Sequence, residues 1–308
     1  MHILKYRYLY FILPAILLVA SIITIATLGL KPGVDLQGGS LMEVSYEEER
    51  PSVESVNEAL AEIGMDELRV QPAGEDSFLI RSRELSDEEK SRVIETIALD
   101  KTVTLERSTT IGATIGDELR AKGWVAIFFV SLTVLLYIAF VFRNVRGPDG
   151  AQIDGVPSWK YGSVAIFTLL HDIIIPTGLF AVLGATRGAE VDSLFIVAIL
   201  TILGISINDT IVVFDRIREN LRRNVEARKK ESFELVVGRS MDETTSRSLN
   251  TSLAVVIALV ILYLVGPELT RNMSLTLMVG MIAGTYSSLF LASPLLVELE
   301  KWQTTKKK

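Results

Sequence analysis

Six long apolar stretches constrain the fold of this chain more than any other feature of its sequence. They cover residues 8–30, 124–142, 163–184, 193–214, 248–265 and 273–297. A helix needs about 20 apolar residues to cross a bilayer. Only helices and closed barrels satisfy their backbone groups in hydrocarbon, and these stretches are too long for barrel strands. The pattern therefore predicts a membrane all-α protein with six transmembrane helices.

Composition excludes several kinds of chemistry. The chain has no cysteine and two histidines, His2 and His171, which rules out disulfides, a thiolate nucleophile and a multi-histidine metal site. Neither G-x-x-x-x-G-K-[ST] nor G-x-G-x-x-G occurs, so no nucleotide-binding fingerprint is present. We therefore expect no cofactor, no metal and no enzymatic activity, and any energy input must come from elsewhere.

Basic residues predict the topology. Short loops on one side of the predicted helices carry 18 Lys and Arg, and those on the other side carry two. Because positive residues stay in the cytoplasm, both termini are expected there. The predicted domains are an uncleaved first helix (1–30), an external domain (31–122), a five-helix region (123–300) with a cytoplasmic loop (216–247), and a basic tail (301–308).

The external segment has the pattern of a small α+β domain. Strands are expected at 41–47, 68–71, 78–81 and 103–106, and helices at 53–63 and 87–99, the second with a capping box of Ser86 and Glu89. The order βαββαβ predicts a ferredoxin-like sandwich between the first two transmembrane helices. Its net charge of −10 argues against nucleic acid as a ligand. A sheet edge could pair with an extended polypeptide or with a neighbouring domain.

The polar segment 216–247 is dense in charges of both signs. We expect it to extend the fourth transmembrane helix and then to form a surface helix. That helix would lie beside anionic lipid headgroups or act as a solvated connector.

Ionisable residues inside the apolar stretches are the first candidates for function. An ionised side chain near the bilayer centre costs about 3 kcal/mol, yet His171 and Asp172 lie in the third stretch and Asp209 in the fourth, while Arg247 opens the fifth. Arg247 facing Asp209 would favour the ionised acid, so moving the two together and apart would release and bind a proton. His171 and Asp172 could pass protons, and Asn208 could complete the path. Alternatively, these polar groups only hold the helices together.

The stretch from Ser206 to Asn220, Ser-Ile-Asn-Asp-Thr-Ile-Val-Val-Phe-Asp-Arg-Ile-Arg-Glu-Asn, closely resembles the signature of the SecF family of bacterial protein-export membrane subunits. The likeness extends to Gly33-Val-Asp-Leu-Gln-Gly-Gly39, to His171-Asp172, and to the segment around Arg247, so it covers essentially the whole chain. The residues that match the family motifs are Gly33, Asp35, Gly38, Gly39, Asp215, Arg216, Arg218, Glu219 and Asn220. Two loops, 143–161 and the one before Arg247, look longer than usual in the family.

The resemblance implies a function. Such proteins are multi-pass subunits of the bacterial inner membrane. They belong to the resistance-nodulation-division superfamily, pair with SecD, and associate with the SecYEG channel and often YajC. They use the proton-motive force to complete export of unfolded preproteins, with Asp209 and Arg247 as the implied proton-path pair. Three alternatives stay open: a proton-driven exporter of small molecules or lipids, a passive scaffold, and an intramembrane aspartyl protease using Asp172 and Asp209, although the G-x-G-D that such a protease needs is missing.

Overall fold

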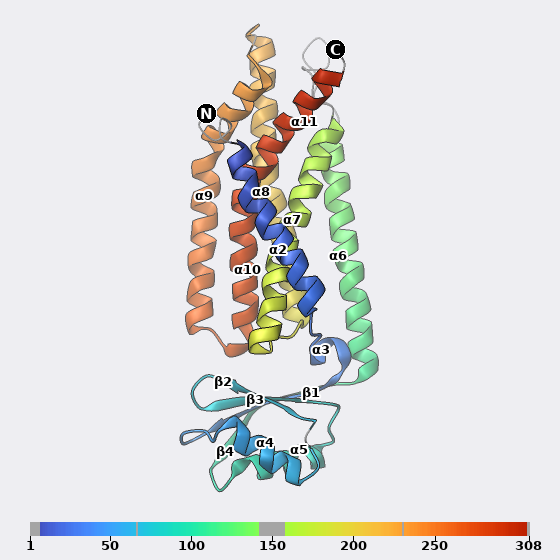
Figure 1. Cartoon of the computed structure of the whole chain (residues 1–308), viewed down its shortest axis with the longest axis vertical. Coiled ribbons are helices and arrows are strands. Elements are labelled where there is room, and N and C mark those ends of the chain that lie inside the picture. Colours follow the sequence, from blue (N-terminus) through green and yellow to red (C-terminus); the bar gives the residue numbers. More distant parts are fainter. Residues whose placement is uncertain (1–6, 66, 142–157, 230, 307–308) are drawn as a thin grey trace. The chain divides into compact units, whose positions relative to one another are not determined.

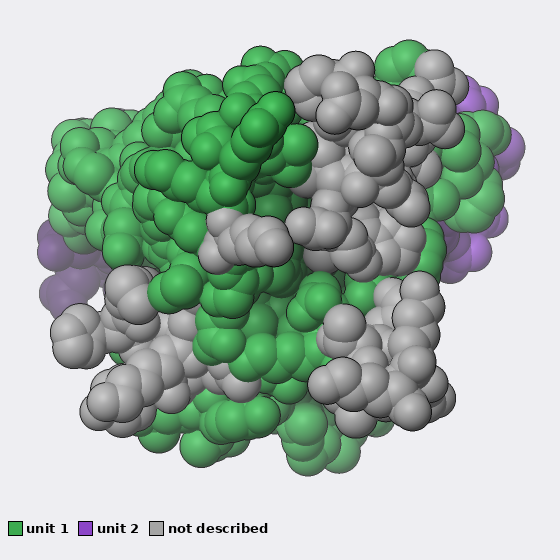
Figure 2. Space-filling model, turned by 90° about the horizontal axis from the view of Figure 1, so that it is seen from above, with its two compact units in different colours: residues 1–29, 126–182, 197–308 green, residues 30–125, 183–196 purple. Residues whose placement is uncertain are grey.

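The computed structural model of this chain describes residues 7–65, 67–141, 158–229 and 231–306. The chain divides into two compact units, coloured separately in Figure 2. One contains residues 1–29, 126–182 and 197–308, and is helical. The other contains residues 30–125 and 183–196, and includes a four-stranded sheet.

Six helical segments among the described residues are long and apolar enough to cross a membrane. They are α2 (Arg7–Leu28), α6 (Ala113–Val141), α7 (Ser158–Arg187), α8 (Ser193–Glu226), α9 (Phe233–Val265), and a last one built from α10 (Glu268–Ser287), η1 (Ser288–Ala292) and α11 (Ser293–Lys306) (Figure 1). The six-helix prediction is therefore confirmed. Of the long loop predicted at 143–161, residues 143–157 lie outside the described residues.

The polar segment 216–247 is mostly helical. Helix α8 continues to Glu226, and α9 begins at Phe233 behind Ser232, whose hydroxyl accepts a hydrogen bond from the Leu235 amide. Surface ion pairs one turn apart stabilise such solvated helix ends, and Glu219 forms two of them with Arg216 and Arg223. The expected separate surface helix is thus the first part of α9, and Arg247 lies inside that helix rather than at its start.

The last membrane helix contains a single π-helical turn. Pro294 lacks an amide hydrogen and its ring crowds the preceding turn, so a regular helix cannot pass through it unchanged. The chain widens to a π-helix over Ser288–Ala292, just before this proline, and the Ser293 hydroxyl donates to the Ser288 carbonyl. A π-turn of this kind commonly marks a bend at a functional position.

Two glycines let helices of this unit approach closely. A Cβ on Gly178 of α7 would lie 2.5 Å from the Ser21 Cα of α2, and the Gly178 carbonyl accepts a hydrogen bond from Thr24. A Cβ on Gly284 of α10 would lie 3.1 Å from the Ser206 Cβ of α8. Small residues at such contacts are how membrane helices gain close packing.

The second unit contains the predicted ferredoxin-like domain. Its elements are β1 (Gly39–Tyr46), α4 (Val53–Glu62), β2 (Arg69–Ala73), β3 (Ser77–Ser82), α5 (Asp87–Ala98) and β4 (Val103–Ile111). The sheet is antiparallel with the order β2-β3-β1-β4, which confirms the fold. Alternate side chains of β1 and β3, including Met42, Val44, Phe78 and Ile80, form the core with the two helices. Strand β4 is longer than expected because it pairs with β1 back to Gly39.

The glycine-rich segment before β1 forms a tight turn after the short helix α3 (Val34–Gln37). Gly38 and Gly39 have φ angles of +81° and +136°, which side chains rarely adopt. A Cβ on Gly38 would lie 2.6 Å from the Ala113 Cα, and one on Gly39 would lie 2.3 Å from the Ser82 carbonyl oxygen. Both glycines are therefore required by backbone shape and by close backbone contact.

Candidate functional site

Asp172 lies at the centre of a buried polar cluster formed by α7, α8 and α10. Its side chain is fully buried. One carboxylate oxygen accepts hydrogen bonds from the Ser206 hydroxyl and from the Ser287 hydroxyl, the latter at 2.8 Å. The other oxygen lies 2.8 Å from His171 Nδ1. The carboxylate is thus held by three partners from three helices.

His171 extends this cluster. It is buried, and its Nε2 lies 2.8 Å from the Tyr286 hydroxyl. An ionised Asp172 can only accept hydrogen bonds, so His171 Nδ1 then donates to it, and a neutral His171 accepts from Tyr286 at Nε2. The result is a continuous chain of exchangeable protons from Tyr286 through His171 to Asp172 and Ser206.

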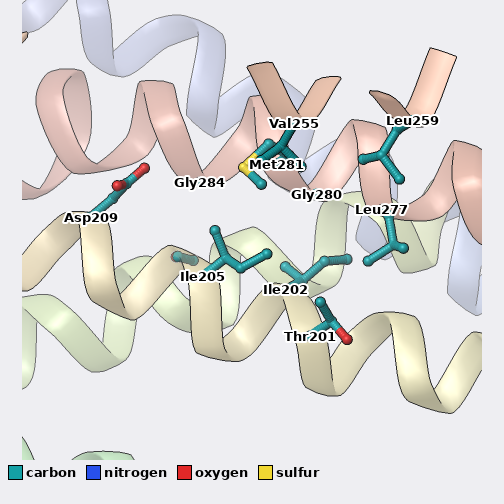
Figure 3. Close-up of a pocket in the computed structure, with 11 residues that line it drawn as sticks. Thr201, Ile202, Ile205, Asp209, Val255, Leu259, Leu277, Gly280, Met281 and Gly284 are labelled. Carbon is teal, nitrogen blue, oxygen red and sulfur yellow. The ribbon is translucent and has the colours of Figure 1, made fainter. Parts of the chain in front are cut away.

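Asp209 lies one turn further along α8 in a different environment. Its carboxylate lines a cavity of about 60 Å³ bounded by α8, α9 and α10 (Figure 3). Most of the lining is apolar, including Ile202, Val255 and Met281. Throughout the described ranges, no side chain forms a hydrogen bond or ion pair with the Asp209 carboxylate.

Two charged groups act electrostatically on Asp209: Arg247 of α9 and Asp172 of α7. Arg247 is exposed at the surface of the chain. No ion pair within 4.0 Å joins it to Asp209 in the part of the chain that the structure describes. The predicted Asp209–Arg247 pair is therefore close enough for an electrostatic interaction, but the two side chains are not in direct contact as an ion pair.

The other predicted path residue, Asn208, is exposed. Neighbouring positions on a helix point about 100° apart, and the rotation of α8 places Asn208 on its exposed side while Asp209 is buried. The predicted motif residues after Asp209 brace the polar end of α8. Asn220 donates to Ser240 and to Glu243 of α9, Arg216 pairs with Glu243, and Arg218 donates to the Val141 carbonyl of α6, whereas Asp215 is exposed.

The predicted glycine-motif residues lie in the second unit. Gly33 donates its amide to the Val191 carbonyl, and Asp35 accepts a hydrogen bond from the Ser193 amide at 3.1 Å. Gly38 and Gly39 form the tight turn described above. These four residues shape the connection into the sheet domain.

Sequence reasoning missed four partners. Ser206, Ser287 and Tyr286 hold the Asp172–His171 pair, and Glu243 holds Arg216. Ser206 belongs to the recognised motif without an assigned role, and Tyr286–Ser288 is a polar run inside an apolar stretch. Both signals are present in the sequence, but hydroxyl groups are common in membrane helices, so neither points to a partner.

The described residues contain no cluster of three or more metal-ligating side chains. Two carboxylates on neighbouring helices remain as the chemical core of the site. One has three hydrogen-bond partners, and the other lines a small, mostly apolar cavity. Such a pair can bind, hold and release protons as helices move.

Comparison with known families gives two matches. A model described as "Protein export membrane protein SecD/SecF, C-terminal" matches residues 93–151 and 155–302. A second, described as "SecD/SecF GG Motif", matches residues 23–49. The matches include both Asp172 and Asp209, as well as the tight glycine turn.

Curated relatives match over nearly the whole chain. The protein translocase subunit SecF of Thermobaculum terrenum is 37% identical over 97% of this chain and 93% of its own length. That of Anaerolinea thermophila is 33% identical over 98% of this chain and 96% of its own length. A SecDF subunit of Brucella abortus is 33% identical, but the matched region covers only 33% of that longer protein.

Among solved structures, SecDF from Thermus thermophilus, a translocon-associated membrane protein, has a TM-score of 0.83 and 28% identity. The match covers 98% of this chain and 39% of the SecDF chain. SecDF in a super-membrane-facing form has a TM-score of 0.65 and 29% identity, and the match again covers 39% of that chain. The chain therefore belongs to the SecD/SecF family of protein-export membrane proteins, as a multi-pass membrane protein with a role in protein export.

Proposed function

We propose that this chain converts proton flow into movement that promotes late steps of protein export. The observation that carries the proposal is the cavity between α8, α9 and α10, because Ser206 and Asp209 both line it. Ser206 also donates to Asp172. The cavity therefore connects a hydrogen-bonded carboxylate to an unbonded one.

A proton would pass between Asp172 and Asp209 in short steps through this cavity. At about 60 Å³, the cavity exceeds the roughly 15 Å³ that is needed to hold one water. A water there would bridge the Ser206 hydroxyl and the Asp209 carboxylate. Asp172, His171 and Tyr286 continue the path on the other side of Ser206.

Arg247 would set the direction of the step. It acts on Asp209 through space without an ion pair, so a small movement of α9 toward α8 would bring the guanidinium to the carboxylate. The guanidinium stays charged, so its approach favours the ionised acid and its retreat favours the protonated acid. Release and uptake of a proton are thereby tied to the distance between two helices.

The proposed setting is a membrane assembly. A SecD subunit would pair with this chain, in keeping with the 39% share that it matches in SecDF. The SecYEG channel and YajC would be neighbours, and an unfolded preprotein would be the cargo. The 18-to-2 distribution of basic residues supports both termini in the cytoplasm and the sheet domain outside.

The alternatives fit the geometry less well. A drug-sized ligand needs a cavity of about 300 Å³ or more, which the cavity at Asp209 does not approach. An aspartyl protease needs two carboxylates that share one proton, whereas Asp172 is already held by Ser206, Ser287 and His171. A passive scaffold and the proton-driven function predict opposite results in the experiment described next.

That experiment is export into inverted membrane vesicles with and without a proton gradient, using wild-type chain and Asp209→Asn. The amide keeps the shape of the side chain but cannot carry a proton to and fro. We expect a gradient to stimulate export by the wild type, and we expect that stimulation to disappear in the variant while assembly with the partner subunit is retained.

The matched control is Glu226→Gln, which makes the same chemical change at an exposed surface pair of α8. It should keep the stimulation. If Asp209→Asn keeps it too, the proton path through this residue is wrong and the scaffold function stands.

A further inference from the structure

The loop between α7 and α8, residues 188–192, is fastened to the sheet domain within the second unit. Its backbone forms a parallel bridge with the segment after α2: the Gly33 amide donates to the Val191 carbonyl at 2.8 Å, and the Val191 amide donates to the Lys31 carbonyl at 2.7 Å. The Ser193 amide adds a hydrogen bond to Asp35. The loop is therefore hydrogen-bonded to the segment that leads into β1.

The same loop also contacts strands β2 and β3 of the sheet. Gln71 of β2 donates to the Gly188 carbonyl at 3.1 Å. Glu190 pairs with Arg81 of β3 at 3.2 Å and with Arg69 of β2 at 3.7 Å. Arg81 also donates to the Gln71 side chain, so the four side chains form one network.

Glu190 is the most enclosed member of this ion-pair network. Its side chain is 9% exposed, against 17% for Arg81 and 68% for Arg69. Burial raises the pKa of its carboxyl, and Arg81, Arg69 and Lys31 oppose that shift. A buried charge without its partners is costly, so the ionised Glu190 is tied to the arginines of the sheet.

The loop joins the two helices that carry the carboxylates. Helix α7 is continuous from Ser158 to Arg187 and contains Asp172, and α8 is continuous from Ser193 to Glu226 and contains Asp209. An α-helix transmits displacement along its axis because every turn is hydrogen-bonded to the next. A shift of either helix must therefore reach residues 188–192.

We propose that Glu190 is a transmitting residue: by holding the 188–192 loop on Arg81 and Arg69, it makes the sheet domain move with the α7–α8 hairpin. This inference rests on the proposed proton-driven function and names the element that passes its movement to the sheet domain. The peptide connections from the sheet domain to α2 and α6 then follow this movement and do not drive it.

The first test is Glu190→Gln in the assembled complex, with Glu88→Gln as the matched control. Glu88 is an exposed carboxylate of α5 in the same domain. Two readouts are needed: hydrogen exchange of the Gly33 and Val191 amides, which reports the fastening itself, and the gradient-dependent stimulation of export. We expect exchange to rise about tenfold in Glu190→Gln, and stimulation to fall at least threefold, with neither change in the control.

A charge reversal separates transmission from simple folding. Glu190→Arg combined with Arg81→Glu and Arg69→Glu restores both ion pairs between the same positions with opposite polarity. The triple variant should recover both slow exchange and stimulation, whereas Glu190→Arg alone should not. If the triple variant recovers slow exchange without stimulation, the fastening does not transmit movement and the proposal is overturned.

A covalent substitute gives the sharpest result, because the chain has no cysteine of its own. A Cβ on Gly33 would lie 3.3 Å from the Glu190 Cβ, close to the 3.5–4.5 Å of disulfides. In Gly33→Cys/Glu190→Cys the charge is lost and a removable link replaces it. Stimulation should be low when the pair is reduced and recovered when it is oxidised.

Failure of this inference can be told from failure of the proposed function. If the oxidised pair blocks export, the loop must leave the domain during the cycle and Glu190 does not make them move together. If wild-type export shows no gradient dependence, the proton-driven function is wrong, while the exchange and cross-linking results still report whether Glu190 fastens the loop.

Discussion

Asp172 and Asp209 are carboxylates on neighbouring membrane helices, yet their surroundings are opposite. Asp172 is held by Ser206, Ser287 and His171, whereas Asp209 ends in a cavity without such partners among the described residues. A carboxylate with several buried partners is held in place by the cost of leaving those partners unsatisfied. Asp209 has no such cost to oppose a change of partner, which is what the proposed function requires of it.

The largest expected effect is on stability. Asp172→Ala leaves two buried hydroxyl groups and a histidine without their acceptor, and each orphaned polar group carries a cost. We expect a loss of about 2 to 3 kcal/mol, and a smaller loss for Asp209→Ala, which leaves no hydrogen-bond partner unsatisfied among the described residues. Unfolding of the purified chain in mixed micelles by a denaturing detergent measures both. Equal losses of stability in the two variants would contradict the difference between Asp172 and Asp209.

The serine partners sharpen the comparison. Ser206→Ala and Ser287→Ala each remove one hydrogen bond to Asp172, and such bonds between membrane helices average about 0.6 kcal/mol. The same unfolding measurement, combined with Asp172→Ala in double-mutant cycles, should show each serine's cost vanishing once the acid is absent. If the costs add fully, the serines stabilise the helices independently of Asp172.

The smallest effect is expected at the edge of the cluster. Tyr286→Phe removes the hydroxyl next to His171 Nε2 but leaves the ring packed against the imidazole. We expect less than about 0.6 kcal/mol of destabilisation and a slower gradient-dependent step in vesicle export. Unchanged export in Tyr286→Phe would place the end of the proton path at His171.

Local patterns in the sequence were sufficient to predict much of the fold. The six spans follow from runs of apolar residues, and the βαββαβ order follows from periods of 2 and 3.6 residues. The capping box of Ser86 and Glu89 is present with both of its hydrogen bonds. The fifth helix is longer than its apolar span, because charged residues mark the edge of a bilayer and not the end of a helix, and α9 begins 14 residues before Arg247.

The candidate site was only partly predictable. Asp172, Asp209 and His171 were identifiable because an ionisable residue in an apolar stretch is unusual wherever it points. Asn208 was grouped with Asp209 as its sequence neighbour, yet it is exposed, since adjacent helix positions face different directions. The outward turn of Asn208 depends on how α8 is rotated, and hydropathy does not report rotation.

The sequence by itself determined the number of spans, the sheet domain and the identity of the buried charges, because those depend on neighbouring residues and their periodicity. Only the tertiary structure decided that Ser287 meets Asp172 from 115 positions away and that Glu190 meets Arg81 from 109 positions away. The physical reason is that such contacts depend on the rotation and crossing of whole helices and strands, which many different local patterns would allow equally well.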